Sequence, residues 1–371
     1  MMQMIQLNHS WSQRIILEPA NTIPMAMMLE TLILTAADVS ALLPIEACVA
    51  AVERAVALGS REGTGSHAML GVHVPGGAFH VKAAALELED GRYFASKTNA
   101  NHPGNPAARG LPTIQGILVL SDAETGFPLA VMDSARLTEL RTAAATGVAA
   151  RHLARRDSSV VTIVGCGRQG RAHLRVLSAL FPVERVMAVD LDAGVARRFS
   201  VEMSEELGLP VDVVARVGDG SRLSDICVTC SSSGRAVLGV ADVKPGMFIA
   251  AVGADNPSKQ EIDPALLASS RVVVDSLEQC RRIGDLQHAI RAGVIAANEV
   301  FVELGAIVDG RAPGRESDDE TIVFDSTGTA FQDVAAAVLV YREAVEAGRG
   351  VRIALDSAPT VLNAPARTPP R

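Results

Sequence analysis

The spacing of apolar positions changes along the chain. Between about 68 and 132, short apolar runs of strand length are separated by turns such as Glu89-Asp90-Gly91 and Glu124-Thr125-Gly126. From about 160 onward, apolar runs rich in β-branched residues alternate with stretches of helical period. Alternation of this second kind is typical of βαβ units. The pattern therefore predicts an α/β protein with a doubly wound parallel sheet, preceded by a second, mixed α+β domain.

The same pattern gives the expected elements. The strands expected in the first region are 79–84, 93–97, 114–120 and 128–132. The strands expected in the second region are 160–164, 186–189, 211–214, 226–229, 247–252, 272–275 and 322–325. The helices expected with most consequence for the fold are 36–39, 44–58, an Ala-rich helix 134–154 and a helix 330–346.

These elements divide the chain into four parts. Residues 1–28 lack a sustained period and the layout of a signal peptide, so we expect a flexible extension. We assign 29–133 together with 322–357 to one domain, because the helix 330–346 is expected to fold back on the first region. Residues 134–321 form the parallel-sheet domain, and the Pro-rich tail 358–371 is expected to be disordered.

A glycine turn lies between two of the expected strands. The strand 160–164 runs into Gly165-Cys166-Gly167-Arg168-Gln169-Gly170 and then into a helical stretch, and the next strand ends at Asp190. The first glycine suits the tight turn, the second lets backbone approach a pyrophosphate, and the third lets helix pack on strand. The helix N-terminus then offers N–H groups to phosphate, and the aspartate can accept from ribose hydroxyls. This context predicts a Rossmann domain that binds a dinucleotide.

Composition excludes several other classes of protein. The 371 residues carry a net charge of −8 without a Lys/Arg-rich block, which argues against a nucleic-acid partner. No apolar stretch approaches the ~20 residues that span a membrane. The five cysteines are scattered, and Cys227-Val-Thr-Cys230 lies in an expected buried strand. We therefore expect reduced thiols, no metal site and a cytoplasmic protein.

Three cations are placed where they could bind an anion. Lys82 and Lys97 lie inside apolar strands expected to be neighbours, and Arg141 lies in the Ala-rich helix. A single such lysine would be assigned to the solvent face, but two with an arginine favour a pocket for a carboxylate.

Two aspartates follow strands of the parallel sheet, at the edge where such sheets bind ligands. Asp255 ends Gly253-Ala254-Asp255 and is either a turn residue or a general acid/base. Asp325 begins Asp325-Ser326-Thr327-Gly328, which is either a helix cap or a wall of the cofactor site.

Several motifs in this order resemble the ornithine cyclodeaminase/mu-crystallin family over about residues 30 to 350. The matching segments are Val81-Lys82, Lys97 before 99–106, 110–116, 129–133, Arg141-Thr142-Ala143-Ala144, the glycine turn, 252–255 and 324–328. The resemblance implies that the first domain binds substrate and forms a homodimer. It also implies that Lys82 and Arg141 hold the substrate carboxylate while Asp255 acts on the substrate nitrogen.

On this basis we expect an NAD(P)-dependent oxidoreductase acting at the C–N carbon of a small α-amino or cyclic α-imino acid, most simply a ketimine reductase of the Δ1-pyrroline-2-carboxylate type. The alternatives are an ornithine cyclodeaminase and a non-catalytic NAD(P)H-dependent binding protein. The residues expected to bind substrate are Lys82, Lys97 and Arg141. The residues expected to bind the cofactor are Gly165, Gly167, Arg168, Gln169, Gly170, Asp190, Thr142, Ser231 and Thr327.

Two features qualify this interpretation. Asp190 favours NAD(H) over NADP(H), because a carboxylate repels a 2′-phosphate, although Arg197 and Arg198 lie nearby in sequence. Many family members also carry an arginine upstream of the first motif lysine, where it binds the carboxylate. This chain has none clearly at that place: the nearest alternatives are Arg61, His67 and His73.

Overall fold

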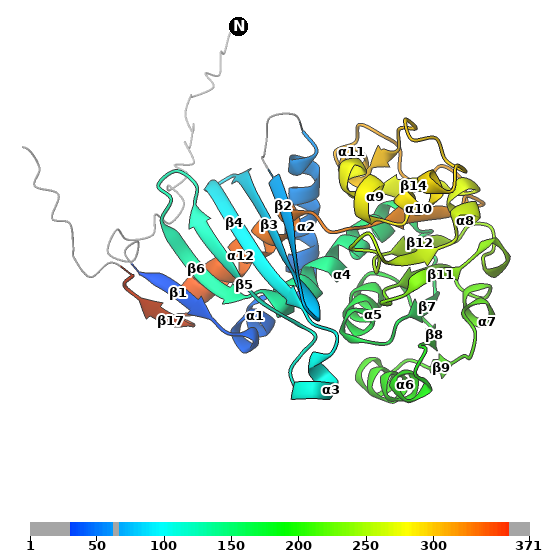
Figure 1. Ribbon diagram of the computed structural model, residues 1–371, viewed down its shortest axis with the longest axis horizontal. Helices are drawn as coiled ribbons and strands as arrows, with labels where there is room; N and C mark the ends of the chain where they lie inside the picture. The colour runs from blue at the N-terminus through cyan, green and yellow to red at the C-terminus, as the bar shows by residue number, and fades with distance from the viewer. Residues whose placement is uncertain (1–29, 62–66, 356–371) are drawn as a thin grey trace, which may run out of the picture.

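Two sheets lie on either side of a group of helices (Figure 1). The computed structural model describes residues 30–61 and 67–355. One sheet is mixed and the other is wholly parallel, so the predicted class, a Rossmann domain with a second α+β domain, is confirmed. The expected extension 1–28 and tail 358–371 lie outside the described residues.

The first sheet has seven strands in the order β17-β1-β6-β5-β4-β3-β2. Only the β1–β6 pair is parallel, and the other pairs are antiparallel. Its strands are β1 (Thr31–Leu34), β2 (His67–Val74), β3 (Gly77–Leu88), β4 (Gly91–Asn101), β5 (Ile114–Asp122), β6 (Pro128–Asp133) and β17 (Val351–Ile353), with the short helix α3 (Asn105–Arg109) between β4 and β5.

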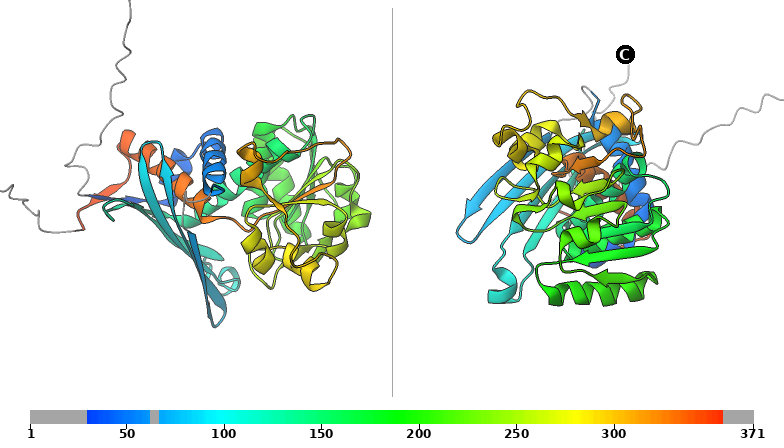
Figure 2. Two further views of the ribbon diagram at one scale, coloured as in Figure 1. Left: turned by 90° about the horizontal axis from the view of Figure 1, so that it is seen from above. Right: turned by 90° about the vertical axis from the view of Figure 1, so that its right-hand side faces the viewer.

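Helices cover one face of this sheet (Figure 2). They are α1 (Ala36–Leu42), α2 (Ile45–Gly59), α4 (Ser134–Leu153) and α12 (Ala330–Glu346). Helix α12 is apolar around most of its circumference, with Val334, Val338 and Val340 almost fully buried. A helix apolar on all sides belongs in a core, and α12 packs against the sheet, α2 and α4.

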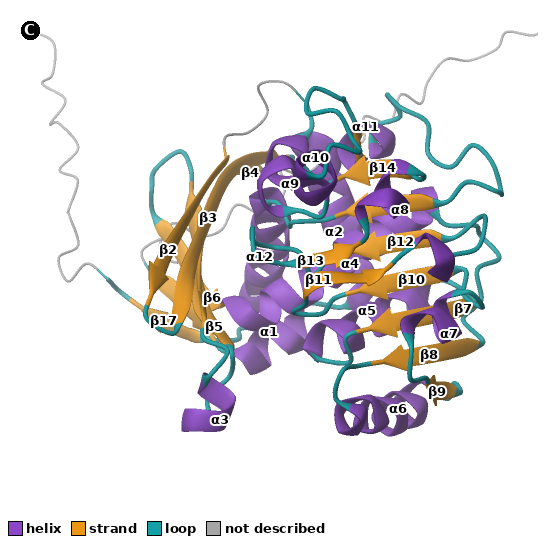
Figure 3. Ribbon diagram, turned by 45° about the vertical axis from the view of Figure 1, so that its right-hand side comes forward, coloured by secondary structure: helices purple, strands orange, loops and turns teal. Residues whose placement is uncertain are grey.

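The second sheet has eight parallel strands in the order β15-β14-β16-β12-β10-β7-β8-β9 (Figure 3). They are β7 (Val160–Val164), β8 (Arg185–Val189), β9 (Val211–Val213), β10 (Ile226–Thr229), β12 (Phe248–Ala251), β14 (Arg271–Val274), β15 (Val302–Glu303) and β16 (Ile322–Asp325). The accompanying elements are α5 (Arg168–Leu180), α6 (Ala193–Leu207), α7 (Val217–Ser221), α8 (Pro264–Ala268), α9 (Leu277–Ile283), α10 (Leu286–Arg291), α11 (Leu304–Val308), the 3₁₀ turn η2 (Val240–Asp242) and a two-stranded sheet of β11 (Gly234–Leu238) and β13 (Gln260–Ile262).

One expected domain boundary is wrong. Residues 322–325 were assigned to the first domain, but β16 pairs with β12 on one side and β14 on the other, inside the parallel sheet. All four of its residues are buried, as expected of a strand that is covered on both faces. The chain therefore leaves the Rossmann domain after Asp325, and residues 326–329 lead into α12 (Figure 1).

The remaining structural checks concern membrane segments and cysteines. Among the described residues, no helix combines the length and apolarity needed to cross a bilayer. All five cysteines are free, and the strand expected at Cys227 is β10.

Candidate functional site

The glycine turn has the geometry of a dinucleotide site. Gly165 has φ of +103°, a conformation that favours glycine. A Cβ at Gly170 would lie 2.3 Å from the carbonyl oxygen of Gly165, so α5 can approach β7 only with glycine there. A Cβ at Gly167 would meet nothing within 4 Å, which leaves open space beside the N-terminus of α5. These residues fit a bound pyrophosphate.

Asp190 lies at the end of β8, next to this turn. Its Oδ2 accepts a hydrogen bond from the backbone N–H of Cys166 at 2.8 Å, and its Oδ1 accepts from Asp192 N–H at 2.9 Å. The carboxylate is therefore fixed beside the turn. Leu191, the next residue, is fully exposed.

The other expected cofactor residues are distributed around the same edge. Arg168 Nε donates to Glu139 on α4 at 3.1 Å, while the buried Gln169 Oε1 has no partner among the described residues. Thr142 is half-buried on α4 and donates to the Thr138 carbonyl. Ser231 follows β10, and a Cβ on Gly165 would lie 3.0 Å from its nitrogen.

Thr327 follows β16, at the start of the segment that links the two domains. Its hydroxyl donates to Asp275 Oδ1 at 3.1 Å, and only 4% of the residue is exposed. Asp275 also accepts from the Ser326 hydroxyl and from Gly328 N–H. The end of β14 thus fixes the segment that links the two domains.

Lys82 and Lys97 are direct neighbours, as expected, paired across β3 and β4. Lys97 is only 3% exposed, and its Nζ lies 2.9 Å from Asp333 Oδ1 and 2.7 Å from Oδ2. Arg141 is 4% exposed, and its Nε donates to the same Asp333 Oδ1 at 2.8 Å. Asp333, on α12, therefore neutralises part of a buried cluster of cations.

Burial controls the protonation of this cluster. It lowers the pKa of Lys97 to about 7, and the charges of Arg141 and Lys82 act in the same direction against Asp333. Burial raises the pKa of Asp333, but the charges of Arg141 and Lys97 outweigh it and lower that pKa overall. Asp333 is therefore the ionised partner.

Lys82 is the more accessible of the two lysines. Its Nζ donates to the carbonyl oxygens of Thr327 at 2.9 Å and Gly328 at 2.7 Å, which fixes it against the interdomain segment. Burial and then the charge of Arg141 lower its pKa. Lys82 thus places a cation against the segment that links the two domains.

Arg141 itself is held in place by α12. Nη1 donates to Gln332 Oε1 at 2.9 Å, in addition to the bond from Nε to Asp333. A Cβ on Gly328 would lie 2.6 Å from Nη1 and 3.1 Å from Nη2. The glycine therefore keeps the space beside the guanidinium open.

Asp255 belongs to the Rossmann domain and follows β12. Its side chain is 53% exposed, and its Oδ1 accepts from Lys259 Nζ at 2.8 Å. Partial desolvation raises its pKa, but the charge and hydrogen bond of Lys259 outweigh this and lower the pKa overall, with Lys82 and His80 contributing. Asp255 and Lys82 are thus close enough for each to influence the pKa of the other.

The residue opposite Lys82 on the outer side is Met69, on β2. None of the three expected substitutes for the missing arginine takes that place. Arg61 pairs with Asp309, His67 lies edge-on against the Phe331 ring, and His73 lies opposite Ala78. An apolar thioether therefore borders the site where a further cation was expected.

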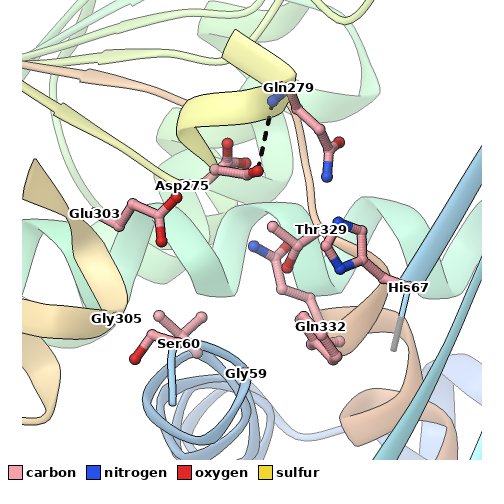
Figure 4. A pocket seen from close by; sticks show the side chains of 12 residues that line it. Gly59, Ser60, His67, Asp275, Gln279, Glu303, Gly305, Thr329 and Gln332 are labelled. Carbon is pink, nitrogen blue, oxygen red and sulfur yellow. Dashed lines mark hydrogen bonds between the residues drawn. The ribbon is translucent and has the colours of Figure 1, made fainter. Parts of the chain in front are cut away.

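A cavity lined by both polar and apolar residues lies beside the interdomain segment (Figure 4). Residues of α2, α9, α11 and α12 line it, and His67 of β2 points toward Gln332 across it. Gln332 is fully buried, and its Nε2 has no partner among the described residues. The cavity adjoins the Arg141–Gln332 contact rather than the Asp255 side of the cleft.

Sequence reasoning missed Asp333, Gln332, Lys259 and Glu261. Asp333 and Gln332 lie in a helix whose existence was predicted, but a polar residue in a helix carries no sign of which way it faces. Lys259, four residues after Asp255, was available as a spacing signal. Glu261 is fully buried and could be recognised only from the structure.

Comparison with known proteins identifies the family of this chain. A sequence model of the ornithine cyclodeaminase/mu-crystallin family matches residues 29–348, so the chain belongs to that family. Alanine dehydrogenase of Archaeoglobus fulgidus is 38% identical over 335 residues, covering 88% of this chain and 98% of that protein.

Two solved structures are similar over most of the chain. An archaeal alanine dehydrogenase dimer with bound NAD has a TM-score of 0.82 at 38% identity, covering 88% of this chain and 100% of that one. The Δ1-pyrroline-2-carboxylate reductase of Thermococcus litoralis, in complex with NADH and L-proline, has a TM-score of 0.83 at 30% identity, covering 87% and 100%.

Proposed function

We propose that this chain is an NAD(H)-dependent ketimine reductase that reduces a small cyclic α-imino acid of the Δ1-pyrroline-2-carboxylate type. The observation that carries the proposal is the placement of two groups: Lys82, paired with Lys97, has its Nζ against the interdomain segment, and Asp255 follows β12 of the Rossmann domain with an exposed carboxylate. One domain thereby supplies a cation for a carboxylate and the other an acid/base group, beside a glycine turn that fits a dinucleotide.

The cations would hold the substrate carboxylate. Lys82 is the accessible point charge, and Arg141 offers the part of its guanidinium beside Gly328. Lys97 was expected to bind substrate, but it is buried and paired with Asp333. We therefore assign Lys97 to positioning the Asp333 carboxylate, which in turn positions Arg141. Fixing the substrate in this way lowers the entropic part of the barrier, by roughly 7–11 kcal/mol at best.

Asp255 would act on the substrate nitrogen. Because Lys259 lowers its pKa, Asp255 is a carboxylate near neutral pH. In the reductive direction it stabilises the protonated imine and remains beside the amine that forms. In the oxidative direction it accepts a proton from the substrate ammonium group. The nicotinamide of a bound cofactor would supply or accept the hydride at the adjacent carbon.

Met69 favours a cyclic imine over a substrate with a second charged group. It occupies the position opposite Lys82, and its flexible thioether can contact ring methylenes. Met69 offers no charge that could pair with a second carboxylate or a side-chain amine of a substrate. The similarity to the Thermococcus litoralis enzyme crystallised with L-proline supports the same choice.

The test is a substrate panel followed at the NADH absorbance band. We expect NADH consumption with Δ1-pyrroline-2-carboxylate, and little with pyruvate plus ammonia. Ammonia release from L-ornithine with no net change in NADH would instead establish cyclodeamination. Binding of an imino acid with NADH but without turnover would establish a binding protein, and turnover with none of these substrates would reject the proposal.

We also propose that NADH is preferred to NADPH. Asp190 is fixed beside the turn by two backbone N–H groups, where it would repel a 2′-phosphate. A Cβ on Gly194, near the start of α6, would lie 3.5 Å from Nη1 of Arg198, which is a cation that could compensate a 2′-phosphate. A higher kcat/KM with NADPH than with NADH would show that this arginine, and not Asp190, controls the choice.

A second copy of the chain is the proposed partner of the seven-stranded sheet. The face opposite the helices exposes apolar side chains, namely Leu70 (58%), Ile117 (54%), Val72 (45%), Phe79 (39%) and Phe94 (38%). Leu70 and Ile117 lie in one cross-strand row with Val81 and Thr98. Such a patch is typical of an interface, and the similar archaeal enzyme is a dimer. Light scattering should give twice the chain mass, and Ile117→Asp should give the monomer.

A further inference from the structure

Three buried carboxylates form a line from the end of β16, through the start of α10, to β13. Glu261 and Asp285 are fully buried, as is Asp325 at the end of β16. Asp325 accepts from the N–H groups of Asp285 at 3.1 Å and Leu286 at 2.9 Å. Asp285 Oδ1 in turn accepts from the N–H groups of Glu261 at 2.7 Å and of the next residue at 2.9 Å. Each carboxylate thus fixes the backbone that carries the next one.

Glu261 is the end of this line nearest the cofactor edge. Its Oε1 accepts from Ser231 N–H at 2.6 Å, and its Oε2 accepts from Gly253 N–H at 2.8 Å. Ser231 follows β10, and Gly253 follows β12, two residues before Asp255. One carboxylate therefore connects the loops that follow β10 and β12.

The two loops meet a third at this point. A Cβ on Gly165 would lie 3.0 Å from Ser231 N, so the Ser231 loop packs directly on the glycine turn. A Cβ on Gly253 would lie 2.5 Å from Glu261 Oε2 and from Ser231 O. Glu261 and the Ser231 loop therefore pack against Gly253 so closely that a side chain would not fit at this position.

We infer that Glu261 is a positioning residue, which holds the Ser231 and Gly253 loops in register so that the dinucleotide site and Asp255 face each other. A carboxylate suits this task because it is an acceptor at both oxygens, whereas an amide is an acceptor at only one. A buried carboxylate is expensive without such donors. Glu261 has two such donors, the N–H groups of Ser231 and Gly253.

The electrostatic surroundings set the conditions for a test. Burial, and then the charge of Asp285, raise the pKa of Glu261 to about 7. Asp285 has its own pKa raised to about 6 by burial, while the facing thiols of Cys227 and Cys230 have pKa values raised by burial and stay protonated. Measurements at pH 8 therefore compare variants with an ionised wild-type Glu261.

The inference rests on the proposed function for its cofactor, so its test measures binding and backbone protection as well as turnover. The variant is Glu261→Gln, which places an amide NH₂ against one of the two N–H groups. The matched control is Glu303→Gln, since Glu303 Oε1 accepts from Leu277 N–H at 2.9 Å at the other end of the same sheet edge. NADH affinity is measured by fluorescence, and amide hydrogen exchange is followed in the protein without cofactor.

We expect Glu261→Gln to raise the Kd for NADH about tenfold, lower kcat with the imino acid, and speed exchange at the Ser231 or Gly253 amide. Glu303→Gln should change Kd and kcat less than about twofold. Wild-type Kd and kcat in a folded Glu261→Gln protein would overturn the inference, even with a lower Tm. Unchanged exchange at both amides would also overturn it.

A second variant covers the case in which Glu261→Gln does not fold. Glu261→Asp keeps the buried charge but shortens the side chain by one methylene, so it cannot reach both amides. Its Kd for NADH should rise severalfold, and an unchanged Kd would overturn the inference. A wild-type protein that binds neither NADH nor NADPH would instead reject the proposed function together with this inference. Binding by wild type with equal binding by the variants rejects the inference alone.

Discussion

Asp333→Asn should destabilise the protein far more than its single charge suggests. The substitution keeps the shape of the side chain but removes the counter-charge of two cations, Lys97 Nζ at 2.7 Å and Arg141 Nε at 2.8 Å. All three side chains are at least 95% buried. Removing one partner of a buried ion pair costs about 3–5 kcal/mol, because the remaining charge is left without compensation.

The cost should depend on pH, because Lys97 can lose its proton. Its pKa is about 7 in the folded protein, against an ordinary value of 10.5. Asp333 favours the charged form of Lys97, so the pKa of Lys97 in folded Asp333→Asn should be lower still. The added penalty then applies only where wild-type Lys97 is charged, below pH 7, and fades as the pH rises above about 8. The contribution from Arg141, which stays charged, does not fade.

Urea unfolding at pH 6 and pH 8.5 measures this difference. The expected loss is about 3–5 kcal/mol at pH 6 and about 1.5–3 kcal/mol at pH 8.5, the cost of a hydrogen bond to a remaining charge. The control is Asp212→Asn, whose partner Arg185 is 54% exposed, and it should change stability by less than about 1 kcal/mol at both values. A loss in Asp333→Asn equal to that of the control at pH 6 would refute the assignment of Asp333 as the central counter-charge.

Gly328→Ala should raise the substrate KM at least tenfold, because the added Cβ would lie 2.6 Å from Arg141 Nη1. The control is Gly310→Ala, because Gly310 has a similar φ (+73° against +79° at Gly328) but open space around an added Cβ. Both variants should lose about 1 kcal/mol in urea unfolding from backbone strain, and equal KM values would show that the space beside the guanidinium is not used. Asp255→Asn should lower kcat for the oxidation of proline about 10²–10⁴-fold in steady-state assays, since in that direction Asp255 accepts a proton from the substrate nitrogen. Lys82→Met should mainly raise KM, because carboxylate binding is shared by ground and transition states, and the reverse pattern would exchange the two roles.

Local patterns predicted much of the fold. The strand at 160–164 and the helix at 330–346 coincide with β7 and α12, because a β-branched run and an Ala-rich apolar segment leave few alternatives. The pairing of Lys82 with Lys97 also followed from the expectation of neighbouring strands, and the register confirms it.

The errors come from features that local patterns do not contain. The expected strands did not include β1, β2 or β17; β2 has Gly71 and two histidines, and its residues are mostly exposed. Strand order is not written in local sequence, so β16 was placed in the wrong sheet although it was predicted as a strand. The partners of the site residues depend on tertiary packing, which is why Asp333 and Glu261 were missed.

Transfer of deuterium from NADH to substrate tests the central claim most directly. We propose that the nicotinamide lies beside the C–N carbon of an imino acid held by Lys82 and Arg141, with Asp255 at its nitrogen. With NADH that carries deuterium at both nicotinamide C4 positions and with Δ1-pyrroline-2-carboxylate, we expect proline carrying deuterium at its α-carbon, and none when Lys82→Met is used at low substrate concentration. Proline without deuterium, or no proline with a bound cofactor, would contradict it.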